Sequence, residues 1–154
     1  MAKKPGVKPV AQNRKARHDY FIEESIECGI ELNGSEVKSM RAGRVNLKES
    51  YAMVKNGEVI VLGMHISPYE QGSFYNPDPM RPKKLLLHKS EIRKLAAQVA
   101  RQGYALIPLE IYLKDSRMKL LLGVCVGKHL HDKREDEAKK DAKREIERTM
   151  RGRD

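Results

Sequence analysis

The sequence predicts a single, mainly β domain with a few short helices. Two β-prone runs, 51–55 and 58–62, flank Asn56-Gly57, a strong signal for a hairpin with a tight turn. A second pair of β-prone runs, 105–113 and 117–126, flanks three polar residues and indicates another hairpin. The chain has 154 residues, which is enough for one core of ordinary size and too few for two full domains.

At the N-terminal side, residues 1–17 are predicted to form a basic, flexible arm, because they combine two prolines, high charge and scattered apolar residues. The folded domain is predicted to span residues 18–127. We expect a first strand over 18–22, which is rich in aromatic and β-branched residues. A short helix over 24–32 follows, ended by Asn33-Gly34 as a C-cap.

The middle of the domain contains two further helices and a long loop. Residues 35–43 open with a possible N-cap serine and close on a glycine, which predicts a short helix. Four prolines make 67–84 too broken for regular structure, so we expect a loop there. Between 89 and 102, apolar residues recur at spacings of three, four and seven, which predicts an amphipathic helix.

Residues 128–154 are predicted to form a flexible tail. Ala138, Ala142, Ile146 and Met150 fall four apart, on a stripe too narrow to hold a helix by itself. We therefore expect the segment to be disordered when free and helical on a partner.

Composition excludes several classes of protein. No apolar run approaches the length of a membrane span, and the first residues lack the apolar core of a secretory signal, so we expect a cytoplasmic protein. Cys28 and Cys125 are far apart and are expected to be buried free thiols. The net charge is +10, and residues 1–18 hold six Lys or Arg and no acid. Such a segment suits a polyanion, although a merely solubilising tail has the same composition.

Catalytic motifs are lacking. The glycines and Lys of 123–128 have the wrong spacing for a phosphate-binding loop, and no zinc-protease or serine-hydrolase motif occurs. His129 and His131, beside Asp132, allow either acid-base chemistry on RNA or simple contact with it. In the segment 34–47, Lys38, Arg41 and Arg44 lie among small residues, which fits either a phosphate contact or an ordinary solvated helix face. We expect no enzyme, no metal and no cofactor.

Six segments, in order along the chain, resemble the small protein B family, the bacterial partner of transfer-messenger RNA. They are His18–Glu24, Gly34–Ser39, Arg41–Leu47, Met64–Gly72, Arg81–His88 and Gly127–Glu135. The resemblance covers roughly residues 12–148. It implies an oligonucleotide-binding (OB)-type antiparallel β-barrel with about three helices and a disordered C-terminal tail.

The resemblance also implies a function, which is to bind the tRNA-like domain of transfer-messenger RNA (tmRNA, SsrA) and deliver it to stalled ribosomes for trans-translation. The implied partners are tmRNA, the small-subunit decoding centre and mRNA channel and, indirectly, alanyl-tRNA synthetase and elongation factor Tu. No membrane is involved, and a monomer is expected.

Carried over residue by residue, the resemblance implies two sets of contact residues. The implied tmRNA-binding residues are Asn13, Glu27, Glu36, Lys38, Ser39, Arg41, Asn46, Leu85, Leu86 and Leu87. The implied decoding-site contacts are His18, His131, Asp132, Lys133 and Arg134, with the rest of the tail helical in the empty mRNA channel. Two other hypotheses stay open at this point: an RNA-modifying or RNA-cleaving enzyme using 129–134, and a ribosomal or general single-strand-binding protein.

Overall fold

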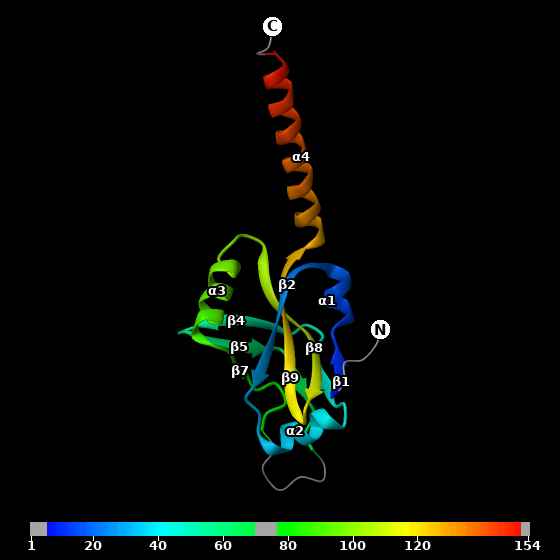
Figure 1. Cartoon of the computed structure of the whole chain (residues 1–154). Coiled ribbons are helices and arrows are strands. Elements are labelled where there is room, and N and C mark those ends of the chain that lie inside the picture. Colours follow the sequence, from blue (N-terminus) through cyan, green and yellow to red (C-terminus); the bar gives the residue numbers. More distant parts are fainter. Residues whose placement is uncertain (1–5, 70–76, 152–154) are drawn as a thin grey trace.

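The structure is a computed structural model of the chain and describes residues 6–69 and 77–151. Figure 1 shows a β-rich body from which one long helix projects. The elements follow in the order β1 (Val7–Gln12), α1 (Arg14–Asp19), β2 (Tyr20–Ile30), α2 (Gly34–Arg41), β3 (Val45–Asn46), β4 (Tyr51–Lys55), β5 (Glu58–Leu62), β6 (His65–Ile66), β7 (Lys83–Leu86), α3 (Lys89–Val99), β8 (Tyr104–Lys114), β9 (Arg117–Gly127) and α4 (Lys128–Arg151).

Six strands close into an antiparallel ring in the order β8-β4-β5-β7-β2-β9, because β9 pairs with both β2 and β8. This confirms the mainly β fold and its barrel. The interior is filled by apolar side chains that are at most 1% exposed, among them Val59, Val61, Leu106, Ile111, Leu120 and Leu122. Strand β1 lies outside the ring against β8, and β3 pairs with β6 in a separate two-stranded sheet.

Both predicted hairpins are confirmed. In the β4–β5 turn, Asn56 and Gly57 take positive φ angles of 52° and 73°, as a type I′ turn requires. In the β8–β9 turn, Asp115 and Ser116 also take positive φ angles, and the Asp115 backbone N–H donates to the carbonyl of Gly6. The predicted helices over 35–43 and 89–102 correspond to α2 and α3.

The helix predicted over 24–32 is wrong, because residues 24–30 belong to the long strand β2 and 31–32 are irregular. Ile26, Cys28 and Ile30 are the less exposed residues and alternate with more exposed ones, which is the period of a strand. A shift in register between Ile22 and Glu24 interrupts that alternation upstream, so the period of a strand is hard to recognise in the sequence. The predicted first strand is also displaced, since His18 lies in α1 and β2 begins at Tyr20.

The described part of the expected N-terminal arm is folded. Residues 7–12 pair with β8, and the side chains of Val10 and Ala11 pack against the core. Pro9 is tolerated because β1 is an edge strand with an irregularity between Pro9 and Ala11. Residues 1–5 lie outside the described residues.

Two other segments differ from expectation or are described in part. The loop expected over 67–84 is irregular at 67–69 and 77–82 and gives way to β7 at Lys83, while 70–76 lie outside the described residues. The tail expected to be disordered forms α4, which continues directly from β9 and projects from the body (Figure 1). Its sequence favours a helix locally through Ala, Lys, Glu and Arg. None of the helices in the described residues is both long and apolar enough to cross a bilayer.

Candidate nucleic-acid interface

The helix α2 is fixed to the barrel through the buried carboxylate of Glu36. Its Oε1 accepts a hydrogen bond from the Asn33 backbone N–H at 2.9 Å, which forms a capping box at the start of the helix. The Arg81 guanidinium, just before β7, donates to both oxygens, at 2.6 and 3.4 Å. Glu36 is 4% exposed, and its carboxylate fixes the start of α2 to Arg81.

Beyond this anchor, α2 presents cations to solvent. Lys38 and Arg41 are exposed, and the Lys38 ammonium lies 5.6 Å from the centre of the Tyr69 ring. Asn46 on β3 is also exposed, and its Oδ1 accepts from the Lys48 backbone N–H at 2.9 Å. Lys38, Arg41 and Asn46 therefore form the accessible part of the predicted RNA-binding set at this end of the barrel; we call these three residues the α2 surface.

Several residues of the implied tmRNA-binding set lie inside the protein. Asn13 caps α1 by accepting from the Ala16 N–H, and its amide donates to the carbonyls of Leu47 and Pro108 at 3.2 and 3.0 Å. Ser39 is fully buried, and no hydrogen-bond partner for its hydroxyl is found in the described residues. Asn13 therefore joins the start of α1 to the segments at Leu47 and Pro108, and Ser39 lies inside the protein.

The remaining residues of this set are dispersed. Leu85 is buried in the core, whereas Leu86 is 51% exposed beside β2. Leu87 is half-buried just after β7. Glu27 lies on β2, where the Tyr112 hydroxyl donates to it at 2.5 Å. This bond, assisted by the nearby Lys114, lowers the pKa of Glu27 and keeps it ionised.

The predicted decoding-site residues lie at the other end of the barrel. In Figure 1, α2 lies at the bottom of the body, and α4 leaves from the top. His18, at the end of α1, is exposed and bonds Asp19 at 3.0 Å. His131 stacks on Phe21, and Asp132 is exposed. Lys133 and Arg134 follow in α4, and their side chains are outside the described set.

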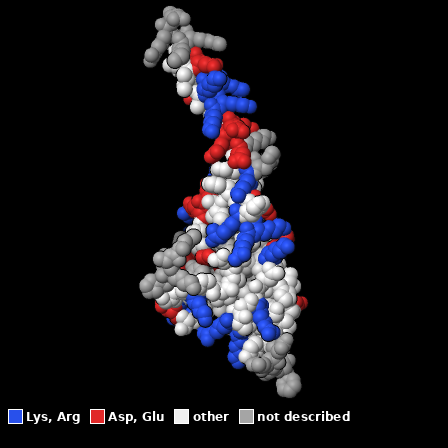
Figure 2. Space-filling model, turned by 90° about the vertical axis from the view of Figure 1, so that its right-hand side faces the viewer, with Lys and Arg blue, Asp and Glu red and all other residues white. Residues whose placement is uncertain are grey.

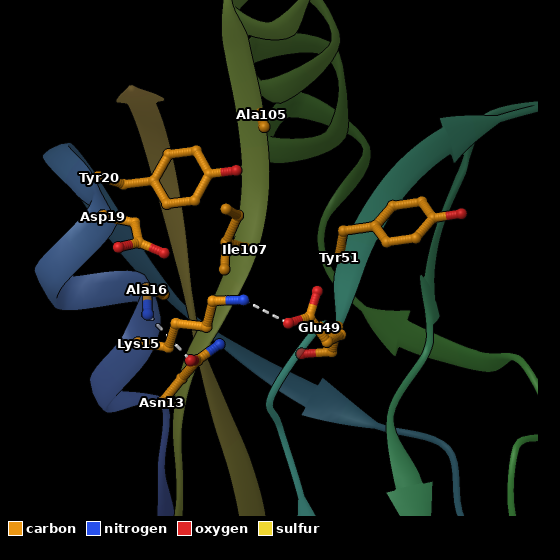
Figure 3. A pocket seen from close by; sticks show the side chains of 10 residues that line it. Asn13, Lys15, Ala16, Asp19, Tyr20, Glu49, Tyr51, Ala105 and Ile107 are labelled. Atoms are coloured by element: carbon orange, nitrogen blue, oxygen red, sulfur yellow. Dashed lines mark hydrogen bonds and ion pairs between the residues drawn. The ribbon is translucent and has the colours of Figure 1, made fainter. Parts of the chain in front are cut away.

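A second basic surface was missed by sequence reasoning. Arg14, Lys15 and Arg17 are exposed on α1, and Figure 2 shows Lys and Arg side chains grouped at this level on the α1 side of the molecule. Beside them opens a cavity of about 370 Å³ between α1, β4 and β8 (Figure 3). A flexible arm is predicted over residues 1–17, whereas residues 14–17 belong to the helix α1.

Residues 6–69 and 77–151 give little support for a metal site or a reactive thiol. No group of three His, Cys, Asp or Glu side chains suited to a metal ion occurs among them. Cys28 and Cys125 are buried free thiols, as predicted, and burial raises the pKa of Cys28 to about 12 and that of Cys125 to about 11. Neither thiol is activated as a nucleophile.

Comparison with known proteins gives the family. The family described as SmpB protein matches residues 10–152. The chain belongs to the SmpB protein family. An SsrA-binding protein of Acetivibrio thermocellus is 62% identical over 141 residues, covering 92% of each chain. An SsrA-binding protein of Ruminiclostridium cellulolyticum is 63% identical over 147 residues, covering 96% of each. One of Clostridium botulinum is 60% identical over 153 residues, covering 99% of this chain and 98% of the relative.

The family resemblance extends to a solved structure. A chain from the structure described as "tmRNA-SmpB: a journey to the center of the bacterial ribosome" is 50% identical, with a TM-score of 0.67. The match covers 78% of this chain and 85% of that one. SmpB proteins are RNA-binding proteins and not enzymes, which removes the hypothesis of RNA cleavage by 129–134.

Proposed function

We propose that this chain binds the tRNA-like domain of tmRNA and delivers it to stalled ribosomes for trans-translation. The names of its relatives and its likeness to a chain of the tmRNA-SmpB structure support this function. The observation that carries the two-part assignment is the position of the α2 surface and α4 at opposite ends of one barrel (Figure 1). One end can hold the RNA while the other reaches the ribosome.

In this proposal, the α2 surface contacts the phosphate chain, and Glu36, Asn13 and Ser39 act as positioning residues. Lys38 and Arg41 gain affinity by releasing the counterions condensed on RNA. The tail occupies the empty mRNA channel, with His18, His131 and Asp132 near the decoding centre. A helix of 24 residues is about 36 Å long, which is enough to extend well beyond the barrel.

The same proposal includes the cellular context. The protein acts as a monomer in the cytoplasm, where ribosomes work. Alanyl-tRNA synthetase and elongation factor Tu act on the bound RNA and so are indirect partners. No cofactor or metal takes part.

A competition experiment tests the RNA partner. Labelled tmRNA bound to the purified protein is displaced by unlabelled tmRNA, by a tRNA or by an unstructured oligonucleotide. We expect tmRNA to displace at the lowest concentration. Equal displacement by all three would instead indicate a general single-strand-binding protein, the second hypothesis left open by the sequence.

Substitutions test which end holds the RNA. The double variant Lys38→Met, Arg41→Met should weaken tmRNA binding and lower the slope of log K against log salt by about 1 for each phosphate that is no longer neutralised. The double variant Lys89→Met, Arg93→Met, which removes two exposed cations from α3, is the matched control and should leave both quantities unchanged. Equal weakening of binding in the two proteins would show that only net charge matters.

Truncation tests the tail. A chain ending at Gly127 should bind tmRNA with unchanged affinity and fail to support peptide tagging on ribosomes stalled without a stop codon. A tenfold fall in tmRNA affinity would place the tail in the RNA-binding surface instead.

A further inference from the structure

Apart from Asn13, the residues that line the cavity beside α1 have no role in the function proposed above. Ile107 and Ala105 of β8 form an apolar floor, and the Tyr20 ring lies along one side (Figure 3). Asp19 comes from the end of α1 and Glu49 from the turn before β4, so two carboxylates line the same cavity. Its volume of about 370 Å³ lies within the range of small-ligand pockets, about 300–1,000 Å³, near the lower limit.

Glu49 is held in this cavity by both its backbone and its side chain. Its φ angle is 68°, in the left-handed region that few residues other than glycine adopt. Its Oε1 accepts a 2.5 Å hydrogen bond from the Lys15 ammonium, shown dashed in Figure 3. This bond lowers the pKa of Glu49, so the carboxylate is ionised at neutral pH. A carboxylate has about four acceptor sites, and Lys15 uses one of them.

The cavity suits a planar group with hydrogen-bond donors along one edge. The apolar floor and the tyrosine ring favour an aromatic ring system by burial and stacking. The carboxylate accepts from N–H groups, and among the four RNA bases only guanine has two adjacent donors, N1–H and N2–H, on its Watson–Crick edge. The exposed cations Arg14 and Arg17 on α1 can meet the phosphates on either side of such a base.

We propose that this cavity accepts a guanine base extruded from RNA, with the Glu49 carboxylate accepting hydrogen bonds from N1–H and N2–H. Glu49 is chosen over Asp19 because its side chain is 67% exposed, against 42%. The inference rests on the proposed function only in that the ligand is RNA. The site is distinct from the α2 surface, although Asn13, which lines the cavity, donates to the carbonyl of Leu47 next to Asn46.

The test is an NMR titration of the full-length, isotope-labelled protein with GMP, AMP, CMP and UMP. We expect GMP to shift the amide signals of Ser50, Ala105 and Ile107 saturably, and to bind at least tenfold more tightly than the other three. Absence of saturable shifts at these residues, or equal affinity for AMP and GMP, would overturn the proposal.

Two variants isolate the carboxylate. Glu49→Gln preserves shape and should weaken GMP binding at least tenfold. Glu23→Gln, an exposed carboxylate on β2 outside the cavity, is the matched control and should bind GMP like the parent. The amide spectra also report whether each variant is folded. Unchanged GMP affinity in the folded Glu49→Gln protein would refute the assigned role.

The source of the base is tested with a short RNA hairpin carrying one unpaired guanine and with GTP. We expect the hairpin to bind more tightly than GTP and to lose its advantage when the guanine is replaced by adenine. Tighter binding of GTP would overturn the assignment to RNA. The tmRNA competition described above gives an independent result. If the protein selects tmRNA but the cavity binds no guanine, only this inference is refuted. If the cavity binds guanine specifically but the protein does not select tmRNA, only the proposed function is refuted.

Discussion

The imidazole ring of His131 lies flat against the phenyl ring of Phe21, with the ring centres 3.8 Å apart and the planes 8° from parallel. This stack joins the first turn of α4 to the start of β2. The Nε2 atom of His131 also lies 3.3 Å from the Oε1 atom of Glu135, one turn further along α4. Because the rest of α4 projects away from the barrel (Figure 1), the stack helps to set the direction in which the helix leaves.

Replacing Phe21 by leucine should loosen the base of α4. An aromatic stack contributes about 0.5–1.5 kcal/mol beyond area burial. Amide hydrogen exchange over residues 128–132 should therefore be several-fold faster in Phe21→Leu than in the parent. Phe21→Tyr retains the ring and is the control. Identical exchange in the leucine variant would show that backbone continuity from β9 fixes the helix instead.

The outer part of α4 should exchange rapidly even in the parent protein. Ala138, Ala142 and Ile146 are exposed, so the helix buries no apolar stripe, and local pairs such as Asp141–Arg144 contribute little. We expect amides of 136–149 to exchange within about tenfold of the rate of an unstructured peptide. Strong protection there in the free protein would contradict the idea that a partner is needed to stabilise this helix.

Elements with a local sequence signal could be predicted, and elements that depend on distant strand pairing could not. The Asn56-Gly57 turn was predictable because positive φ angles are required by two adjacent residues alone. The strand β2 was not, because its alternation is broken by an irregularity that exists only against β9. In the same way, β1 depends on pairing with β8, about a hundred residues away in the chain.

The candidate site shows the same limit. The segment carrying Lys38 and Arg41 could be selected from its sequence, but the burial of Asn13 and Glu36 could not, because their partners Pro108 and Arg81 are distant in sequence. The cavity beside α1 joins residues from three separate segments and leaves no linear motif.

Removing the charge of Glu36 should destabilise the protein. In Glu36→Gln the Arg81 guanidinium loses its ionic partner beside a buried amide, and the free energy of unfolding should fall by about 1–3 kcal/mol. Urea denaturation measures this, with the exposed Glu31→Gln as control. Because the carboxylate is internal, tmRNA affinity of the folded variant should fall less than in Lys38→Met, Arg41→Met. A larger fall would mean that Glu36 contacts the RNA directly.

The amide of Asn13 should be more important for stability than for binding. Asn13→Asp retains an acceptor for the Ala16 N–H but removes both donors to the carbonyls of Leu47 and Pro108. We expect the free energy of unfolding to fall by about 2–4 kcal/mol. Asn46→Asp makes the same change at an exposed position, where the side chain only accepts, and should lower the free energy of unfolding by much less. Equal decreases would show that charge alone is responsible.

Lys83 should make stability depend on alkaline pH. Its side chain is fully buried, its ammonium donates to the carbonyls of Met64 and Pro79, and burial lowers its pKa from 10.5 to about 8. Between pH 8 and 10.5 the unfolded chain therefore holds a proton that the folded chain has released. The free energy of unfolding rises with pH across this window, by about 3 kcal/mol in total from this group.

The difference between parent and Lys83→Met isolates this effect. Cys28 and Cys125, whose pKa values are raised by burial, lower stability as pH rises through the thiol range in both proteins, so their effect cancels. Urea denaturation at pH 7.5, 8.5 and 9.5 should show the parent gaining stability relative to the variant at each step. Lys84→Met changes a half-buried neighbour paired with Glu58, and its stability should differ from that of the parent by the same amount at each pH. A constant difference for Lys83→Met as well would mean that the ammonium stays charged in the folded protein throughout this range.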